Sequence, residues 1–298
     1  MDWASWLQNR GIVSADQGLG VCYEQLLAQL PSHSPLALAL LGGKTAATPG
    51  LAFLTGYQAA LRALCPAAPQ GLGALCVTEN KSVRPNDMAC RWDGQQLNGR
   101  KDFVTAADAA QWVLVAARCE APEQPAQIRL LELDCDQSGV QVELLPALAM
   151  MPDIGHARIH FAAARARVLP GDGWDEYVKP FRSIEDLYVL TATVAWLFGV
   201  LQRAECDEPL RLQLLNLLSA CAELTRHDAR QADTHYLLAG AFSQFSALRG
   251  PIAQCMAALD NPAAALWTRD QALLSFAQKA RDTRLEKARQ SLGLDRVQ

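Results

Sequence analysis

The sequence lacks several features that mark common protein classes. Its 298 residues contain no run of eighteen apolar residues, so no membrane-spanning helix is expected. Basic residues are not in excess, because 27 Lys and Arg against 31 Asp and Glu give a net charge of -4, and nucleic acid is therefore not an expected partner. The N-terminal residues MDWASWLQNRG carry an acidic residue second and no basic segment, so a signal peptide is not expected either.

Paired cysteine motifs are also absent. The nine cysteines are scattered, none forms a C-x-x-C motif, and most sit in apolar runs, as Cys76, Cys221 and Cys255 do. Reduced, buried thiols in a cytoplasmic protein are the simplest interpretation. His156 and His160 stand in a strand-like context without a nearby third ligand, so no metal site is predicted.

Nucleotide-binding and hydrolase motifs are incomplete or missing. The segment Leu41-Gly-Gly-Lys-Thr45 resembles the end of a P-loop, but Leu38 stands where the leading glycine belongs and Pro49 follows closely. The pairs Gly18-Leu-Gly20 and Gly71-Leu-Gly73 lack the third glycine of a dinucleotide-binding turn. No G-x-S-x-G motif occurs, so an α/β-hydrolase nucleophile is not predicted.

The pattern of apolar residues and turn residues changes clearly along the sequence. Half of its residues are apolar, which is enough for a well-packed core. Residues 1–70 favour helices, at 14–29 with Ser14 as the N-cap, and at 52–64 from the helical spacing of apolar residues. Residues 71–171 favour short strands at 112–118, 128–133, 140–144 and 158–161, with a hairpin at Asp93-Gly94. Because no helical crossover fits between these strands, a mostly antiparallel sheet is expected.

Residues 172–298 favour long helices. Ser183-Ile-Glu-Asp186 has the pattern of a capping box and predicts a helix to about residue 203. Asp207-Glu-Pro209 predicts the start of a second helix, which places Leu210, Leu214, Leu217, Leu218, Cys221 and Leu224 on one face. A third helix is expected at about 229–258, and a fourth from Asn261-Pro262 to about 293. The expected fold class is therefore α+β and mostly α, with an N-terminal helical segment, an antiparallel β-domain and a C-terminal four-helix bundle.

The most informative stretch is 74–118, where strand, loop, hairpin and strand follow one another. Two threonines end strands in Val77-Thr78-Glu79 and Val104-Thr105-Ala106. This layout, and the order of helices, strands and helices, resembles a shortened, divergent member of the acyl-CoA dehydrogenase family. In that family a T-E-P-x-x-G-S-D loop and a later aromatic-I-T-N segment hold FAD.

The resemblance implies cofactor contacts at four residues of this chain. Thr78, Val104 and Thr105 match the strand ends that bind the flavin ring, and Asn86 with Asp87 takes the place of Ser-Asp. The loop 79–89 departs from the family pattern because it has no glycine, and the Arg-x-x-Phe-Gly motif of the bundle is missing.

The resemblance also implies a catalytic base. Family members use a glutamate to remove an α-proton while a hydride leaves the β-carbon for the flavin. The late Tyr-Glu-Gly-Thr segment is absent here, but Ile184-Glu185-Asp186-Leu187 is similar to the Leu-Glu-Arg-Leu setting of isovaleryl-CoA dehydrogenase. Glu185 is thus the expected base, and its alternative role is that of an acid in the first turn of a helix.

Two functions remain open at this point. The first is α,β-dehydrogenation of an acyl-CoA or other acyl thioester with FAD as hydride acceptor. The alternative is a degenerate member without flavin that acts as a binding or scaffolding subunit. A homodimer through the bundle is expected in either case, because the helices at 210–224 and 237–256 carry more apolar positions than one seam needs.

Overall fold

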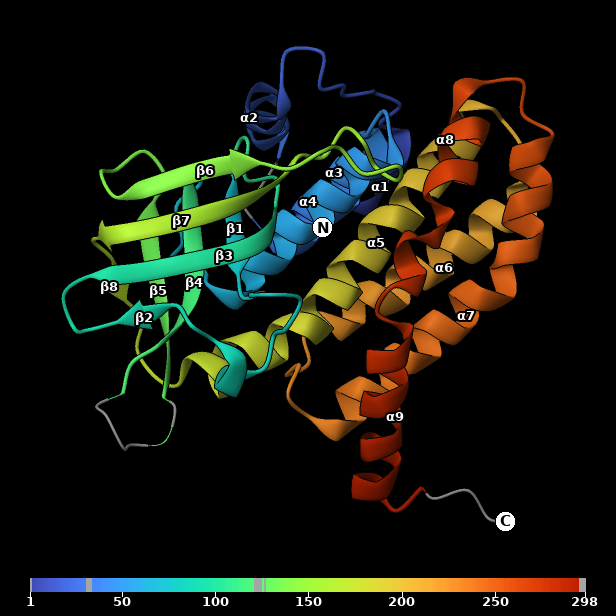
Figure 1. Ribbon diagram of the computed structural model, residues 1–298. Coiled ribbons are helices and arrows are strands. Elements are labelled where there is room, and N and C mark those ends of the chain that lie inside the picture. The colour runs from blue at the N-terminus through green and yellow to red at the C-terminus, as the bar shows by residue number, and fades with distance from the viewer. Residues whose placement is uncertain (1, 31–33, 121–124, 126, 295–298) are drawn as a thin grey trace.

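The computed structural model describes residues 2–30, 34–120, 125 and 127–294. A curved sheet lies on one side of the molecule and long helices lie on the other, with α3, α4 and α5 near the middle (Figure 1). The chain passes from helices to strands and back to helices, as the sequence predicts.

The described N-terminal helices are α1 (Trp3–Gln8), α2 (Leu19–Gln29), α3 (Pro35–Thr45) and α4 (Pro49–Leu64). The predicted start at Ser14 is wrong, because Gly18 with φ 94° precedes α2 and the Ser14 hydroxyl donates to Asp16 instead. Helix α3 was not predicted, since nearly all its residues are buried and it shows no amphipathic pattern. Lys44 in α3 is buried too, and its Nζ donates to the Leu7 carbonyl at 3.1 Å, which is a structural role and not that of a P-loop lysine.

Within the described residues the sheet has eight strands: β1 (Gly73–Cys76), β2 (Arg91–Trp92), β3 (Leu97–Thr105), β4 (Trp112–Arg118), β5 (Ile128–Asp134), β6 (Val140–Leu144), β7 (His156–Ala164) and β8 (Arg167–Val168). Their order is β6-β7-β3-β2-β4-β5-β8, and β1 pairs with β4. The predicted strands 112–118 and 140–144 match β4 and β6, and the hairpin at Asp93-Gly94 joins β2 to β3. Most strand pairs are antiparallel, as expected, whereas β1 and β2 each run parallel to β4. The sheet is therefore mixed.

The C-terminal part contains a π-helical turn η2 (Gly173–Val178), α5 (Lys179–Arg203), α6 (Glu208–Leu224), α7 (Ala232–Ala257), α8 (Pro262–Asp270), a 3₁₀ turn η3 (Gln271–Ser275) and α9 (Gln278–Leu292). The prediction for α6 is confirmed: Asp207 caps it, and the six apolar residues named above are its buried ones.

Two predictions for this part are wrong. The capping box at Ser183 does not begin a helix, because Asp172 caps the helical run further upstream through the amides of Trp174 and Asp175. The fourth helix is not continuous but breaks at Asp270, whose buried carboxylate accepts from the Met151 amide at 2.9 Å. The residues after this break wind as η3 before α9 begins.

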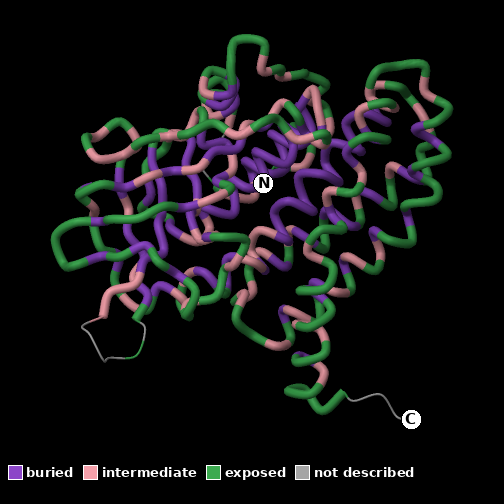
Figure 2. Tube along the Cα trace, viewed as in Figure 1, coloured by how far each residue is buried: buried purple, intermediate pink, exposed green. Residues whose placement is uncertain are grey.

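Helix α5 is the centre of the core. It is buried on almost every side, and Figure 2 shows buried residues along the central helices and in the sheet. Two glycines permit this close packing, since a Cβ at Gly43 would overlap the Ala192 carbonyl and one at Gly56 would meet the Tyr188 carbonyl at 2.7 Å. The run Gly173–Arg203 is long and apolar enough to cross a membrane, but 83% of its apolar window is buried inside the protein, as in the core helix of a soluble protein.

Candidate functional site

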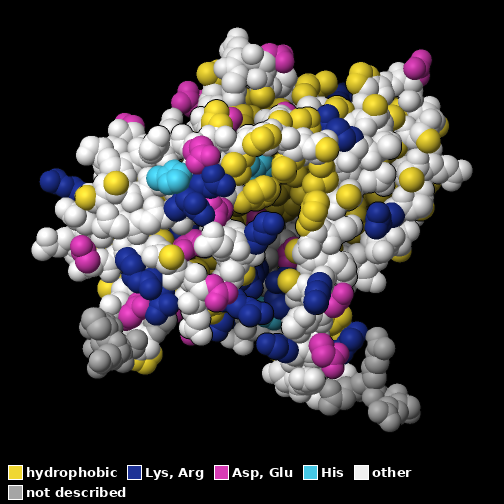
Figure 3. Space-filling view, viewed as in Figure 1, with side chains coloured by type: hydrophobic (Ala, Val, Ile, Leu, Met, Phe, Trp, Pro, Cys, Tyr) yellow, Lys and Arg dark blue, Asp and Glu magenta, His cyan; other side chains and the backbone are white. Residues whose placement is uncertain are grey.

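A cleft between the sheet and the C-terminal helices contains two adjoining cavities. The larger has a volume of about 500 Å³ and the smaller about 160 Å³. Both are lined by Phe103, Thr105 and Glu185, so they form one continuous cleft. Apolar side chains gather around this hollow in the space-filling view (Figure 3).

The two predicted threonines both line the smaller cavity. Thr105 ends β3, and Thr78 follows β1 by two residues. Both are half-buried. Within the part of the chain that the structure describes, neither hydroxyl has a hydrogen-bond partner, so each is free to bind a ligand.

Glu185 lies across the cleft from these threonines, on α5. Because the helical run begins after Asp172, Glu185 is well past the first turn, and the helix dipole there has little effect on it. Burial, followed by the neighbouring Asp186 charge, raises the pKa of Glu185 to about 7, although Arg182 and Arg284 oppose the shift. A carboxyl group with such a pKa is half ionised near neutral pH, as a general base requires.

Val104 and Asn86 do not line either cavity. The Val104 side chain is buried inside the curved sheet, because neighbouring residues on a strand point to opposite faces. Asn86 is exposed on a short 3₁₀ turn, η1 (Pro85–Asp87), and its carbonyl accepts from Arg118 at 3.2 Å. The structure therefore brings Thr78, Thr105 and Glu185 together and places the other two predicted residues elsewhere.

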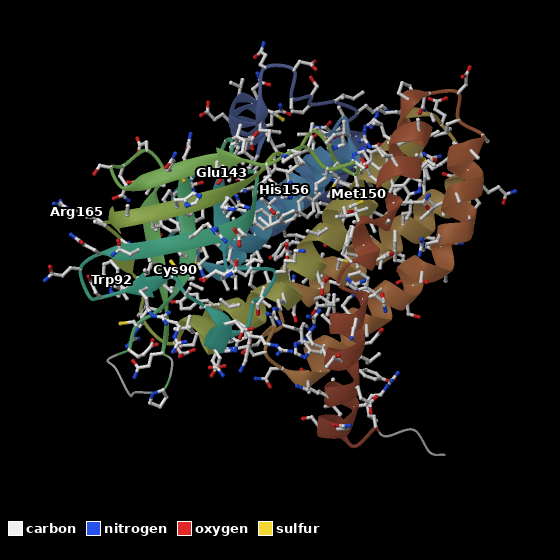
Figure 4. The ribbon with its side chains drawn as sticks, in the orientation of Figure 1. Cys90, Trp92, Glu143, Met150, His156 and Arg165 are labelled. Atoms are coloured by element: carbon white, nitrogen blue, oxygen red, sulfur yellow. The ribbon has the colours of Figure 1, made fainter. Side chains whose placement is uncertain are left out.

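The larger cavity is mainly apolar, and several of its lining residues were not predicted. Phe103 has a left-handed backbone with φ 59° at a register shift between β3 and β7, and its half-exposed ring lies 4.6 Å from that of His156. His156 and Met150 lie where the sheet meets the helices (Figure 4). The break after α8 supplies Leu273, Leu274, Phe276 and Ala277. A bulge and a helix break have no reliable signature in one sequence, so these residues could not be found in advance.

An ion-pair cluster fixes the wall beside Glu185. Asp186 accepts from Arg281 at 2.9 Å and also from Arg284, both on α9. Burial raises the pKa of Asp186, although the two arginines oppose it. The cluster joins α9 to α5, and it holds Arg281 at the edge of the larger cavity. No sequence signal links residues so far apart.

The loop 79–89 is held in place by the contacts of the Glu79 carboxylate. Glu79 is buried and pairs with Lys101 at 2.6 Å. The same carboxylate accepts from the amides of Ala89 at 2.5 Å and Cys90 at 3.2 Å. These two amides are therefore not available to a phosphate.

Residues of the cleft fit the ring of a flavin better than its pyrophosphate. The free hydroxyls of Thr78 and Thr105 suit the polar edge of a flavin ring, and the adjoining walls are apolar. Arg182 also lines the smaller cavity, and its guanidinium lies 5.4 Å from the Trp174 ring centroid. The described residues contain no group of three metal-ligating side chains.

Comparison with known proteins finds solved structures that are similar to this chain. No family model and no curated protein matches the sequence. Solved structures do match: FkbI of methoxymalonyl extender-unit biosynthesis has a TM-score of 0.61 at 17% identity, covering 90% of this chain and 87% of its own. Dibenzothiophene monooxygenase from Paenibacillus sp. A11-2 has a TM-score of 0.60 at 14% sequence identity, and the match covers 96% of this chain and 88% of that enzyme. Butyryl-CoA dehydrogenase from Megasphaera elsdenii has a TM-score of 0.59 at 14% sequence identity, and the match covers 85% of this chain and 80% of that enzyme. The chain has an acyl-CoA dehydrogenase-like fold.

Proposed function

We propose that the protein is a flavin-dependent oxidoreductase that removes hydrogen from the α- and β-carbons of an acyl thioester, with FAD in the cleft. One observation carries this proposal: Glu185, with its pKa raised to about 7, lies between the pocket of Thr78 and Thr105 and a mainly apolar cavity. A half-buried carboxylate between a polar pocket and an apolar one suits proton removal from a bound acyl group.

Each part of the cleft has a separate task in this proposal. A bound FAD would supply the hydride acceptor for the β-carbon. Thr78 and Thr105 would hold its ring by hydrogen bonds, with the backbone beside Val104 as a further contact. The larger cavity takes the acyl chain and excludes water, and Glu185 accepts the α-proton. Asp186 positions the helix wall next to Glu185 through its ion pairs with Arg281 and Arg284.

A direct test compares two glutamine variants in a dehydrogenation assay with a series of acyl-CoA substrates. Glu185→Gln keeps the shape of the side chain and removes the base, so turnover should fall by a factor of at least about 100. Glu208→Gln removes an exposed carboxylate in the first turn of α6 and should leave turnover unchanged. Equal turnover in the wild type and in both variants would assign Glu185 no part in the chemistry.

The flavin-free scaffold is the second candidate, and the loop 79–89 favours it. Glu79 occupies the amides of Ala89 and Cys90, and the loop carries no glycine for a close approach of backbone to pyrophosphate. A folded protein that retains no flavin after incubation with FAD, and turns over no acyl-CoA, would select this candidate.

We also propose a cytoplasmic homodimer that forms through the bundle. Leu212 on α6, with Tyr236 and Leu237 on α7, supports this assembly, because these side chains are 58%, 41% and 48% exposed.

A further inference from the structure

Two cysteines far apart in the sequence meet at one end of the bundle. Cys206 lies in the turn between α5 and α6, and Cys255 lies in the last turn of α7. Their sulfur atoms are 2.7 Å apart, which is closer than two unbonded sulfur atoms normally pack. The two thiols are therefore in direct contact.

The backbone holds Cys206 in place. Its neighbours Glu205 and Asp207 both have left-handed backbones, with φ 53° and 37°. The Cys206 amide donates to the Leu201 carbonyl at 3.0 Å, and the Asp207 carboxylate caps α6 through the Leu210 amide. Such conformations persist only where the surrounding structure enforces them, so the thiol is directed at Cys255 by the fold.

The other seven cysteines are less suited to oxidation. Cys22, Cys65, Cys76, Cys90 and Cys221 are buried, and burial raises the pKa of each of these thiols. Cys119 and Cys135 are half-buried, and burial raises the pKa of Cys135 to about 12. Cys206 is half-buried and has a partner in contact.

We propose that Cys206 and Cys255 are a reversible oxidation site that closes to a disulfide on exposure to a peroxide. The Cys206 thiolate attacks one peroxide oxygen, which gives a sulfenic acid and releases water. The Cys255 sulfur then attacks the sulfenic sulfur, the S–O bond breaks, and a second water leaves. Two thiols and one hydrogen peroxide thus give one disulfide and two waters. Cys206 acts first because it is the more exposed, whereas Cys255 is buried.

The bond would join the turn between α5 and α6 to the end of α7. The disulfide would join two residues that are 49 positions apart in the sequence. Closing this loop lowers the conformational entropy of the unfolded chain. The melting temperature of the oxidised protein should therefore rise by roughly 5–10 °C relative to the reduced protein.

The test treats the fully reduced, purified protein with one equivalent of hydrogen peroxide and counts thiols after denaturation. The count should fall from nine to seven, peptide mapping should find Cys206 bonded to Cys255 in the same chain, and a thiol reductant should restore both the count and the melting temperature. Cys206→Ser should abolish the disulfide, while the control Cys119→Ser should still form it.

Other outcomes of this experiment overturn the proposal. Nine thiols after treatment would show that the contact does not lead to a bond. Loss of two thiols in the Cys206→Ser variant, or a disulfide between two chains, would show that a different pair reacts. None of these results depends on flavin or on acyl-CoA, so they test the oxidation site independently of the proposed function.

Discussion

Replacement of Glu185 by glutamine should stabilise the protein by an amount that grows as the pH rises from about 4.5 and levels off above about pH 7. The pKa of Glu185 is raised from its ordinary 4.5 to about 7 by burial and by Asp186. In the folded state the carboxyl therefore keeps its proton up to about pH 7, whereas in the unfolded state it loses the proton near pH 4.5. Stability is lost as pH rises between these values, because the folded state then holds more protons than the unfolded state.

The size of this effect follows from the two pKa values. At roughly 1.4 kcal/mol per pH unit, the ionised carboxylate costs at most about 3 kcal/mol of unfolding free energy above pH 7. Glutamine has the same shape and no charge, so the variant avoids this cost. For a chain of this size, the expected gain in melting temperature at pH 8 is about 5 °C, with little gain at pH 4.5.

Thermal unfolding of wild type, Glu185→Gln and Glu208→Gln at intervals from pH 4.5 to 8 measures this difference. The Glu208 variant should show no gain at any pH, because its carboxylate is exposed. If Glu185→Gln melts below the wild type at pH 8, the carboxylate is stabilised by Arg182 and Arg284 instead of destabilised by burial. That result would refute a base with a raised pKa.

Three further predictions concern binding, folding and assembly. Thr105→Val should lower flavin occupancy after FAD incubation or shift the flavin spectrum, and an unaltered stoichiometric complex would place the ring elsewhere. Lys101→Met should leave Glu79 as an unpaired buried charge and cost about 3–5 kcal/mol in denaturant unfolding, so a change below about 1 kcal/mol would argue against that ion pair. Light scattering should give twice the chain mass of 32.4 kDa at micromolar concentration, and Leu237→Asp should reduce it, whereas a wild-type monomer would contradict the dimer.

Local sequence patterns predicted those elements whose surroundings are simple. Helix α6 is amphipathic and half-exposed, so the period of its apolar residues identified its buried face, and Asp207-Glu-Pro209 identified its start. Strand β4 is bounded by turns and was predicted residue for residue. The boundaries at 70/71 and 171/172 between the expected domains remain predictions.

Long-range packing decided the elements that the sequence did not predict. Helix α3 is buried on all sides, so its sequence has no helical period to detect. The break after α8 depends on the buried contact between Asp270 and the Met151 amide, which joins two distant segments.

The candidate site was only partly predictable from local sequence patterns. Thr78, Thr105 and Glu185 stand in local patterns that resemble those of the acyl-CoA dehydrogenase family, and all three line one cleft. The ring of Phe103 and the partners of Asp186 depend on a bulge and on α9, and neither is visible in local sequence.

The central claim is that the cleft binds a flavin that oxidises an acyl thioester. The most direct measurement incubates the purified protein with excess FAD, removes free FAD by gel filtration, and records the visible spectrum before and after anaerobic addition of acyl-CoA. We predict that the folded protein retains flavin and that the flavin absorbance bleaches with wild type but not with Glu185→Gln. A folded, colourless protein, or a bound flavin that no acyl-CoA reduces, would contradict the account.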